Sequence, residues 1–337
     1  MVRQELTRYV GHTDQVAGIK LLEAADGVER GNRVLEVWTG SGLFFHVLAD
    51  RALDISTCQF KGIPLAWKSA TGDSHPAYYD PHGLAWLRTF QGGMLVTCGL
   101  DTFGPPSRDG EEDLGLHGRV SNTPAKAVCY QTSWHGDEYQ LEIWGEVRQT
   151  RVFGENLVLR RRLLTWMGSN RIRIEDRVTN EGFSPHPHMI LYHVNAGYPL
   201  LSEDARLKLE VEGTTPRDPE SAGGLKDWSV FQPPTPDFKE QNFIHAPVAD
   251  EKGWVKAELE NPGLGLTLRL SFDKSTLPFM NEWKMTGEGL YVLGIEPMNC
   301  RDLFEGQAEA RQRESLPTLK AGESVEYALE IEVIENQ

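Results

Sequence analysis

The sequence predicts an all-β protein in which two large antiparallel sheets pack face to face. Apolar and polar residues alternate with a period of two over several long segments, which is typical of strands with one buried face. Turns rich in the 33 glycines and 19 prolines separate these segments along the whole chain. We find no long amphipathic helical pattern, so packed sheets are the expected architecture.

Four segments carry the alternation most clearly. In Gly263–Phe272, for example, every second residue is a leucine or phenylalanine. The segments expected as strands are Tyr139–Phe153, Arg171–Asn180, Gly263–Phe272 and Val325–Val333. Asp302–Glu314 is the best candidate for a short helix. Gly213–Thr235 contains seven glycines or prolines and is expected to be a surface loop that flanks a site.

The chain is expected to form one domain that spans residues 1–337. Its 337 residues would allow two domains, but β-sandwiches often form one unit of 200–250 residues or more. Neither a linker-like segment nor an internal repeat divides the sequence. One sandwich is therefore the simpler prediction.

Charge and composition exclude several classes of function. The 34 Lys and Arg residues against 49 Asp and Glu give a net charge of −15, which disfavours nucleic acid as a partner. No apolar run approaches the roughly 20 residues of a membrane span, and the N-terminus lacks the pattern of a secretion signal. The four cysteines are scattered, so we expect reduced, buried thiols in a cytoplasmic protein.

Two histidines lie in segments that are predicted to be extended. In residues 116–121 an extended backbone would direct His117 and Arg119 to the same face, because side chains repeat every two residues. In residues 189–195 His193 and Asn195 share a face with apolar side chains. An unpaired buried polar group costs about 1–3 kcal/mol, so this pair is expected either to be bonded in the core or to face a cleft.

A carboxylate and an aromatic–cation pair add to these candidates. Glu296 ends an apolar strand just before Pro297, where a carboxylate is costly unless it is hydrogen-bonded or functional. Trp283 beside Lys284 suits stacking on a sugar and donation to its hydroxyls. Each feature also has a plain structural explanation: a bonded core histidine, a turn residue or a surface pair. Chemistry alone does not decide between the two.

Seven short segments, taken together, resemble the aldose 1-epimerase (galactose mutarotase-like) superfamily, in an uncharacterised branch of it. Each match is short, and the order and spacing over most of the chain carry the resemblance. The segments are Gly40–Trp67, Phe90–Leu100, Leu116–Arg119, Tyr192–Asn195, Glu240–Gln241 with His245, Trp283–Lys284 and Gly294–Pro297. Where galactose mutarotases have Asn-His-x-Tyr/Phe-x-Asn, this chain has Tyr-His-Val-Asn, which leaves the sugar open.

The resemblance implies a two-sheet supersandwich and an isomerase that interconverts sugar anomers without a cofactor or a metal. By motif, His193 would be the general acid, Glu296 the general base and His117 a histidine that orients the sugar. The partner would be a small sugar, and a homodimer is compatible with this reading. Further candidates for holding the sugar are Arg119, Asn195, Lys284, Glu240, His245, Arg51 and Asp54.

Two alternatives stay open at this point. His186 and His188 form an HxH pattern that could begin a metal site, as in a metal-dependent sugar isomerase. The carboxylate expected a few residues later is absent, so a proline-rich loop with two solvated histidines is the favoured interpretation. A non-catalytic sugar-binding protein is the second alternative, because a fold does not fix a function.

Overall fold

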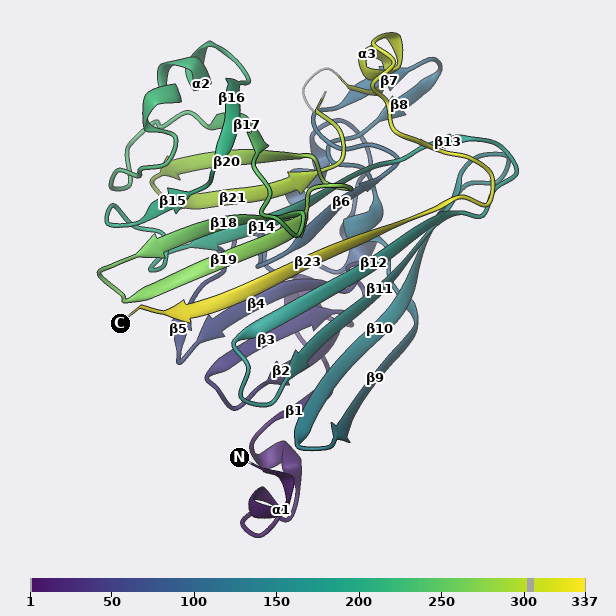
Figure 1. The fold of residues 1–337 in the computed structure, drawn as a ribbon. Coiled ribbons are helices and arrows are strands. Elements are labelled where there is room, and N and C mark those ends of the chain that lie inside the picture. The colour runs from purple at the N-terminus through teal and green to yellow at the C-terminus, as the bar shows by residue number, and fades with distance from the viewer. Residues whose placement is uncertain (1, 302–305, 337) are drawn as a thin grey trace.

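The computed structural model describes residues 2–301 and 306–336, and strands dominate it (Figure 1). The strands form antiparallel sheets of eight, six and five strands and two short two-stranded pairs. The predicted all-β antiparallel class is therefore confirmed. Within the described residues no helix is long and apolar enough to cross a membrane.

The eight-stranded sheet contains most of each of the four segments that alternation predicted as strands; residues 151–153 and 263–265 lie outside its strands. In β12, for example, Ile172, Ile174 and Val178 are buried while the arginines between them face solvent. In spatial order its strands are β15 (Arg206–Lys208), β18 (Trp254–Asn261), β19 (Leu266–Asp273), β23 (Ser324–Glu335), β12 (Arg171–Asn180), β11 (Asn156–Trp166), β10 (Glu138–Thr150) and β9 (Lys126–His135).

Two further sheets pack against the eight-stranded sheet. The six-stranded sheet has the order β16 (Val211–Pro216), β17 (Gln241–Pro247), β20 (Phe279–Gly287), β21 (Leu290–Met298), β14 (Met189–Gly197) and β6 (Val96–Leu100). The five-stranded sheet has the order β1 (Gly18–Glu23), β2 (Arg33–Trp38), β3 (Leu43–Leu48), β4 (Asp54–Phe60) and β5 (Ile63–Pro64).

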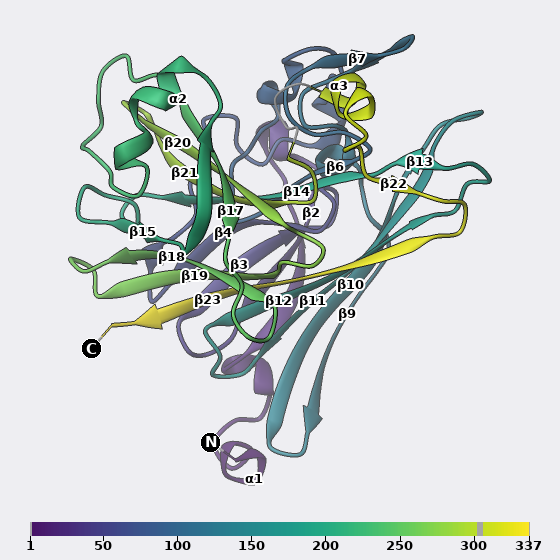
Figure 2. The ribbon, with the colours of Figure 1, turned by 45° about the horizontal axis from the view of Figure 1, so that its top comes forward.

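The six- and five-stranded sheets meet where β4 approaches the start of β6. An isolated bridge joins Ile55 to Leu95 there. The expected second sheet is thus divided in two, and one cluster of buried hydrophobic residues includes members of all three large sheets. Both ribbon views place the purple five-stranded sheet beside the teal strands β9 to β12 (Figures 1 and 2).

In the part of the chain that the structure describes, the α-helices are few and short. They are α1 (Arg3–Leu6), α2 (Pro219–Gly223) and α3 (Gly306–Gln312), and the short strand pairs are β7 (Ser107–Asp109) with β8 (Glu112–Leu114) and β13 (His186–Pro187) with β22 (Thr318–Leu319). Of the helix expected at Asp302–Glu314, residues 302–305 lie outside the described part. The segment expected as a loop, Gly213–Thr235, instead begins inside β16 and contains α2, whose first turn is capped by Asp218.

A buried ionic network links the two layers. The guanidinium of Arg161 on β11 lies 2.7 Å from a carboxylate oxygen of Asp54 on β4 and 2.7 Å from one of Asp176 on β12. Tyr192 on β14 donates its hydroxyl to Asp176 at 2.8 Å. Such a network is tolerable in the interior because every charge has an opposite charge or a hydrogen bond.

Three of the four cysteines are buried as expected, and the fourth corrects the prediction. Cys58, Cys98 and Cys300 are buried, whereas Cys129 is exposed. Cys129 lies on β9, the edge strand of the eight-stranded sheet, where most side chains face solvent.

Candidate active site

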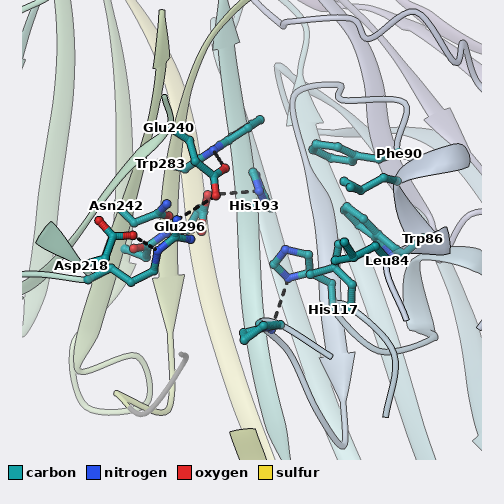
Figure 3. Close-up of a pocket in the computed structure, with 16 residues that line it drawn as sticks. Leu84, Trp86, Phe90, His117, His193, Asp218, Glu240, Asn242, Trp283 and Glu296 are labelled. Atoms are coloured by element: carbon teal, nitrogen blue, oxygen red, sulfur yellow. Dashed lines mark hydrogen bonds and ion pairs between the residues drawn. The ribbon is translucent and has the colours of Figure 1, made fainter. Parts of the chain in front are cut away.

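A cavity of about 570 Å³ opens beside the six-stranded sheet (Figure 3). Its size lies within the range of small-molecule sites. It is lined by Leu84, Trp86, Leu87, Phe90, Gly104, Pro105, Leu116, His117, His193, Arg217, Asp218, Glu240, Asn242, Asn281, Trp283 and Glu296. The close-up shows Trp86, Phe90 and His117 on one side, Trp283, the labelled carboxylates and Asn242 on the other, and His193 between them (Figure 3).

Strand register brings the polar residues of the cavity together. Asn281 on β20 pairs directly with Glu296 on β21. Val194 on β14 pairs with Ile295 on β21, which places His193 beside Glu296 in the antiparallel ladder. Side chains that lie opposite each other on adjacent strands point to the same face. Residues more than 100 positions apart in the sequence therefore meet on one side of the sheet.

His193 and Glu296 form a buried pair at the cavity. The imidazole Nε2 lies 3.1 Å from Oε1 of the carboxylate, and the two residues are 4% and 2% exposed. Oε1 of Glu296 and Nδ1 of His193 have no hydrogen-bond partner among the described residues. The other oxygen, Oε2, accepts a bond of 2.8 Å from Asn281.

A glycine on the same strand makes room for the carboxylate. Gly294 precedes Glu296 by two residues, so both face the cavity. A Cβ placed on Gly294 would collide with Oε1 of Glu296. The strand can therefore hold the glutamate in this rotamer only because the neighbouring position has no side chain.

Burial shifts the protonation of both members of the pair. It raises the pKa of Glu296 to about 8, against the opposing effect of the hydrogen bond from Asn281. Burial, and to a smaller extent His117, lowers the pKa of His193. Both shifts disfavour the charged forms, so at neutral pH the pair retains one proton between two basic sites. Acid–base pairs in enzymes are often tuned in this way.

His117 reaches the cavity from a turn, and the extended backbone predicted for residues 116–121 is wrong. His117 has a φ of 56° and Gly118 a φ of 71°. A Cβ on Gly118 would clash with the carbonyls of Gly99 and Thr102, so the close approach requires glycine there. The expected shared face of His117 and Arg119 therefore does not exist, and Arg119 pairs outside the cavity with Glu155 at 3.6 Å.

His117 is held as a neutral hydrogen-bond donor. Its Nδ1 accepts a bond of 3.4 Å from the backbone N–H of Gly104, which leaves the proton on Nε2. Desolvation lowers the pKa of His117 to about 4. Its ring packs against Trp86 at 4.8 Å and His193 at 5.8 Å between centroids. A neutral imidazole in this position can donate to a hydroxyl without introducing a charge.

Arg51 supports the aromatic wall from behind, and its predicted contact with a sugar is corrected. Its side chain is fully buried. The guanidinium donates to the carbonyls of Ser74, Thr89 and Ser121 at 2.6–2.9 Å. Thr89 directly precedes Phe90, which lines the cavity. Arg51 thus fixes the segments behind the wall and does not line the cavity.

A charged rim closes the opposite side. Glu240 lines the cavity as the sequence suggested, accepting bonds of 2.8 Å from Trp283 and from Arg217. Arg217 also donates to Asp218 at 2.8 Å. Sequence reasoning missed Arg217 and Asp218, although they lie in the glycine- and proline-rich segment that was expected to flank a site. The only signal in the sequence for these two residues was their position in that segment.

Two further sequence candidates are part of the core. Asp54 accepts from Arg161 and from Thr97. Asn195 is fully buried and donates to the carbonyls of Gly93 and His193 at 3.0 Å. Neither lines the cavity, so both assignments to the sugar site are corrected.

The last two candidates, His245 and Lys284, lie on the reverse face of the six-stranded sheet. His245 is fully buried, 3.1 Å from Glu282 and 2.9 Å from the hydroxyl of Thr214. Lys284 donates to the carbonyls of Asp227 and Val230 at 2.9 and 2.7 Å. Lys284 holds the segment after β16 against the sheet, His245 links β16 to β20, and neither lines the cavity.

The HxH pattern is also placed differently from the prediction of two solvated histidines. His188 is 2% exposed, and its two ring nitrogens lie 2.8 Å from the carbonyl of Leu100 and 2.8 Å from the hydroxyl of Tyr327. Both nitrogens are therefore already engaged. Among residues 2–301 and 306–336, no group of three or more His, Cys, Asp or Glu side chains could hold a metal ion.

Comparison with known proteins places the chain among sugar epimerase-like folds. A Klebsiella pneumoniae structure described as a "putative aldose 1-epimerase" is 28% identical, with a TM-score of 0.90 over 96% of this chain and 86% of that chain. A galactose mutarotase-like protein from Clostridium acetobutylicum is 12% identical, with a TM-score of 0.67 over 95% and 99%. Galactose 1-epimerase from Lactobacillus acidophilus is 13% identical, with a TM-score of 0.61 over 95% and 100%.

The family assignment rests on a sequence model that covers most of the chain. No curated protein matches the sequence. The family model described as "Domain of unknown function (DUF4432)" matches residues 29–333. The chain therefore belongs to this family, an uncharacterised branch of the aldose 1-epimerase (galactose mutarotase-like) superfamily.

Proposed function

We propose that the protein is a mutarotase, an isomerase that interconverts the α and β anomers of a sugar, with His193 as general acid and Glu296 as general base. The observation that carries the proposal is the approach of Nε2 of His193 to within 3.1 Å of Oε1 of Glu296 at the wall of the cavity. Similarity to the Klebsiella protein described as a "putative aldose 1-epimerase" supports it.

The chemistry needs an acid and a base that converge on one carbon. Glu296 takes the proton from the anomeric hydroxyl while His193 gives a proton to the ring oxygen, and the bond between that oxygen and the anomeric carbon breaks. The anomeric hydroxyl and the ring oxygen are both bonded to the anomeric carbon. An acid and a base that lie side by side, as His193 and Glu296 do, can therefore reach both oxygens. Rotation about the bond between the first two carbons, followed by the reverse transfers, closes the ring as the other anomer.

The scheme uses the one proton that the pair retains at neutral pH. It needs that proton on His193 and Glu296 ionised, whereas burial in the empty site favours the proton on Glu296, so the proton must pass across the 3.1 Å contact to His193 before the reaction. Each member of such a pair contributes about 10²–10⁴-fold in rate. The open-chain intermediate needs no cofactor, and the aromatic side chains Trp86, Phe90 and Trp283 can stack on the sugar ring.

The direct test is exchange between α and β anomers, measured by NMR on hexoses, pentoses, ketoses and sugar acids. We expect acceleration of at least one sugar by the wild-type protein and its loss in His193→Ala. If the wild-type protein accelerates none of them, the mutarotase assignment is wrong. Binding without exchange would then favour a sugar-binding protein. Metal analysis of the same sample tests the metal-dependent isomerase.

A further inference from the structure

Two asparagines extend the catalytic pair across the sheet. Asn281 on β20 and Asn242 on β17 are 1% and 4% exposed, and both line the cavity. Asn281 donates through Nδ2 to Oε2 of Glu296 at 2.8 Å and to Oδ1 of Asn242 at 3.1 Å. The three side chains therefore form one hydrogen-bonded row from the base outwards.

The row fixes which way each amide points. Nδ2 of Asn281 faces Oε2 of Glu296, as the proposed role of Glu296 requires, because a carboxylate that is ionised to act as a base only accepts hydrogen bonds. The NH₂ group of Asn281 uses its two hydrogens on Glu296 and Asn242, so the atom of Asn242 that faces it must be the carbonyl oxygen. Two amide atoms take no part in these hydrogen bonds: the acceptor Oδ1 of Asn281 and the donor Nδ2 of Asn242.

These two atoms lack partners within the described residues although both are buried. A buried amide group left unpaired is destabilising, so such groups in native proteins need an explanation. A hydroxyl both donates and accepts, and one hydroxyl can bond to both atoms at once. The cavity wall thus presents an incomplete hydrogen-bonding site of the kind that a sugar hydroxyl completes.

We propose that Asn242 and Asn281 form a subsite for the hydroxyl on the carbon next to the anomeric carbon, and so select 2-hydroxy sugars over 2-deoxy sugars. The subsite adjoins the base because Asn281 contacts Glu296 directly. The vicinal hydroxyl is the neighbour of the group that Glu296 deprotonates. This inference rests on the proposed mutarotase function for the position of the anomeric carbon.

The rest of the cavity is consistent with a hydroxyl held at this point. Trp283 pairs with Asn242 in the ladder, and its indole N–H is already used by Glu240. Arg217 and Asp218 bond to each other, and Arg217 also bonds to Glu240. The amides are therefore the buried polar atoms on this wall that remain available, apart from those of the His193–Glu296 pair itself.

The test compares D-glucose, D-galactose and D-ribose with their 2-deoxy analogues. We expect the wild-type protein to prefer the hydroxylated member of its best pair by about 10–100-fold in kcat/KM, because its absence leaves two buried amide atoms unpaired. Asn242→Leu should reduce the preference to within about threefold, mainly by slowing the hydroxylated sugar. The control is Gln241→Leu, the adjacent residue on β17, which bonds outside the cavity to the carbonyl of Glu220.

Binding separates failure of this inference from failure of the proposed function. Titration of Glu296→Gln with each sugar pair reports on the subsite even if the wild-type protein catalyses no exchange, since Gln retains the shape of the side chain. We expect the preference for the hydroxylated sugar in Glu296→Gln and its loss when Asn242→Leu is added. Asn242→Ala serves as a second variant in case Asn242→Leu misfolds, and a thermal melt of each variant shows whether it is folded. An unchanged preference in folded Asn242 variants, or no binding of any of the sugars, overturns the proposal.

Discussion

The two faces of the six-stranded sheet each carry a buried His–Glu pair, and the pairs differ in what surrounds them. His193 and Glu296 face the cavity, and His245 and Glu282 lie on the reverse face; in both, Nε2 is 3.1 Å from a carboxylate oxygen. Both ring nitrogens of His245 are engaged, by Thr214 and Glu282. On the cavity side Nδ1 of His193 and Oε1 of Glu296 have no hydrogen-bond partner among the described residues.

The comparison teaches that residue type and separation do not identify a catalytic pair. A pair that lies off the cavity and whose histidine has both ring nitrogens engaged stabilises the fold, although Oε1 of Glu282 lacks a partner among the described residues. A pair with an unengaged histidine nitrogen and carboxylate oxygen beside a cavity can instead bond to a ligand. His245 and Glu282 serve the first purpose because β17 and β20 alternate, which directs odd and even positions to opposite faces. Four predictions test the contrast.

The largest expected effect is on activity, from the same substitution made on either face. Glu296→Gln should slow anomer exchange by at least about 10³-fold, because an amide cannot accept the proton. Glu282→Gln should stay within about tenfold of wild type, because Gln preserves the shape and the contact with His245. NMR exchange rates decide. Equal losses from the two substitutions would remove the functional distinction between the faces.

The pH profile should sharpen the assignment to the cavity pair. One proton shared by His193 and Glu296 is needed, and it is lost as the pH rises through the pKa of Glu296, about 8. We therefore expect kcat/KM to fall about tenfold per pH unit above pH 8. Because the pKa of His193 is lowered, the second protonation and its loss of rate should come only at acidic pH. A rate that keeps rising above pH 8 would mean that the pair donates no proton.

A smaller effect is expected for the third residue on the cavity side. His117→Ala removes a neutral donor without removing the acid or the base. KM should rise and kcat fall together, with a combined loss of about 10–100-fold in kcat/KM. Steady-state kinetics on the best sugar check this. A change in the pH profile equal to that of Glu296→Gln would instead place His117 in the proton transfer.

The smallest effects are on stability, and they should have opposite signs on the two faces. The pKa of Glu296 rises from 4.5 to about 8 on folding. The contribution of this carboxyl group to the free energy of unfolding is therefore fully present below pH 4.5 and is lost as the pH rises through 8. Glu296→Gln should therefore be more stable than wild type at pH 8, on the order of 1–3 kcal/mol, and nearly equal at pH 4.5.

On the reverse face, Lys284→Met should lower stability by about 2–3 kcal/mol, because the carbonyls of Asp227 and Val230 lose their donor. Denaturant unfolding at pH 5 and pH 8 measures both variants. A Glu296→Gln variant that is less stable than wild type at pH 8 would show that burial of the ionised Glu296 does not destabilise the folded protein.

Much of the fold followed from alternation, because a strand with one buried face shows it in its sequence. β12 spans the predicted Arg171–Asn180, and β23 includes the predicted Val325–Val333. Alternation did not predict that the second layer consists of two sheets. Where these sheets meet, the contact is the isolated bridge between Ile55 and Leu95, and a contact between residues so far apart in sequence leaves no local pattern.

The sequence indicated the site residues that lie in recognisable strand motifs. It did not show which polar side chains are instead bonded to distant parts of the fold. His193 and Glu296, which the motifs indicated, lie on strands and line the cavity, and their catalytic roles stay a prediction. Trp283 and Lys284 were assigned together, yet adjacent strand residues point to opposite faces, so the same parity rule would have favoured Asn281 as the companion of Trp283. Arg51 could not be distinguished from a ligand-binding arginine, because the carbonyls that it binds come from three distant loops.

The ionic network between the layers determines how rigid the site is before a ligand arrives. Tyr192 and His193 are neighbours on β14 that face opposite ways, and the hydroxyl of Tyr192 is bonded to Asp176, the partner of Arg161. The strand cannot slide or rotate without breaking charge-assisted bonds in the interior. His193 therefore loses its conformational freedom when the chain folds and not when a ligand binds. A small ligand should meet an acid that is already in place, and association should not wait for a slow ordering step.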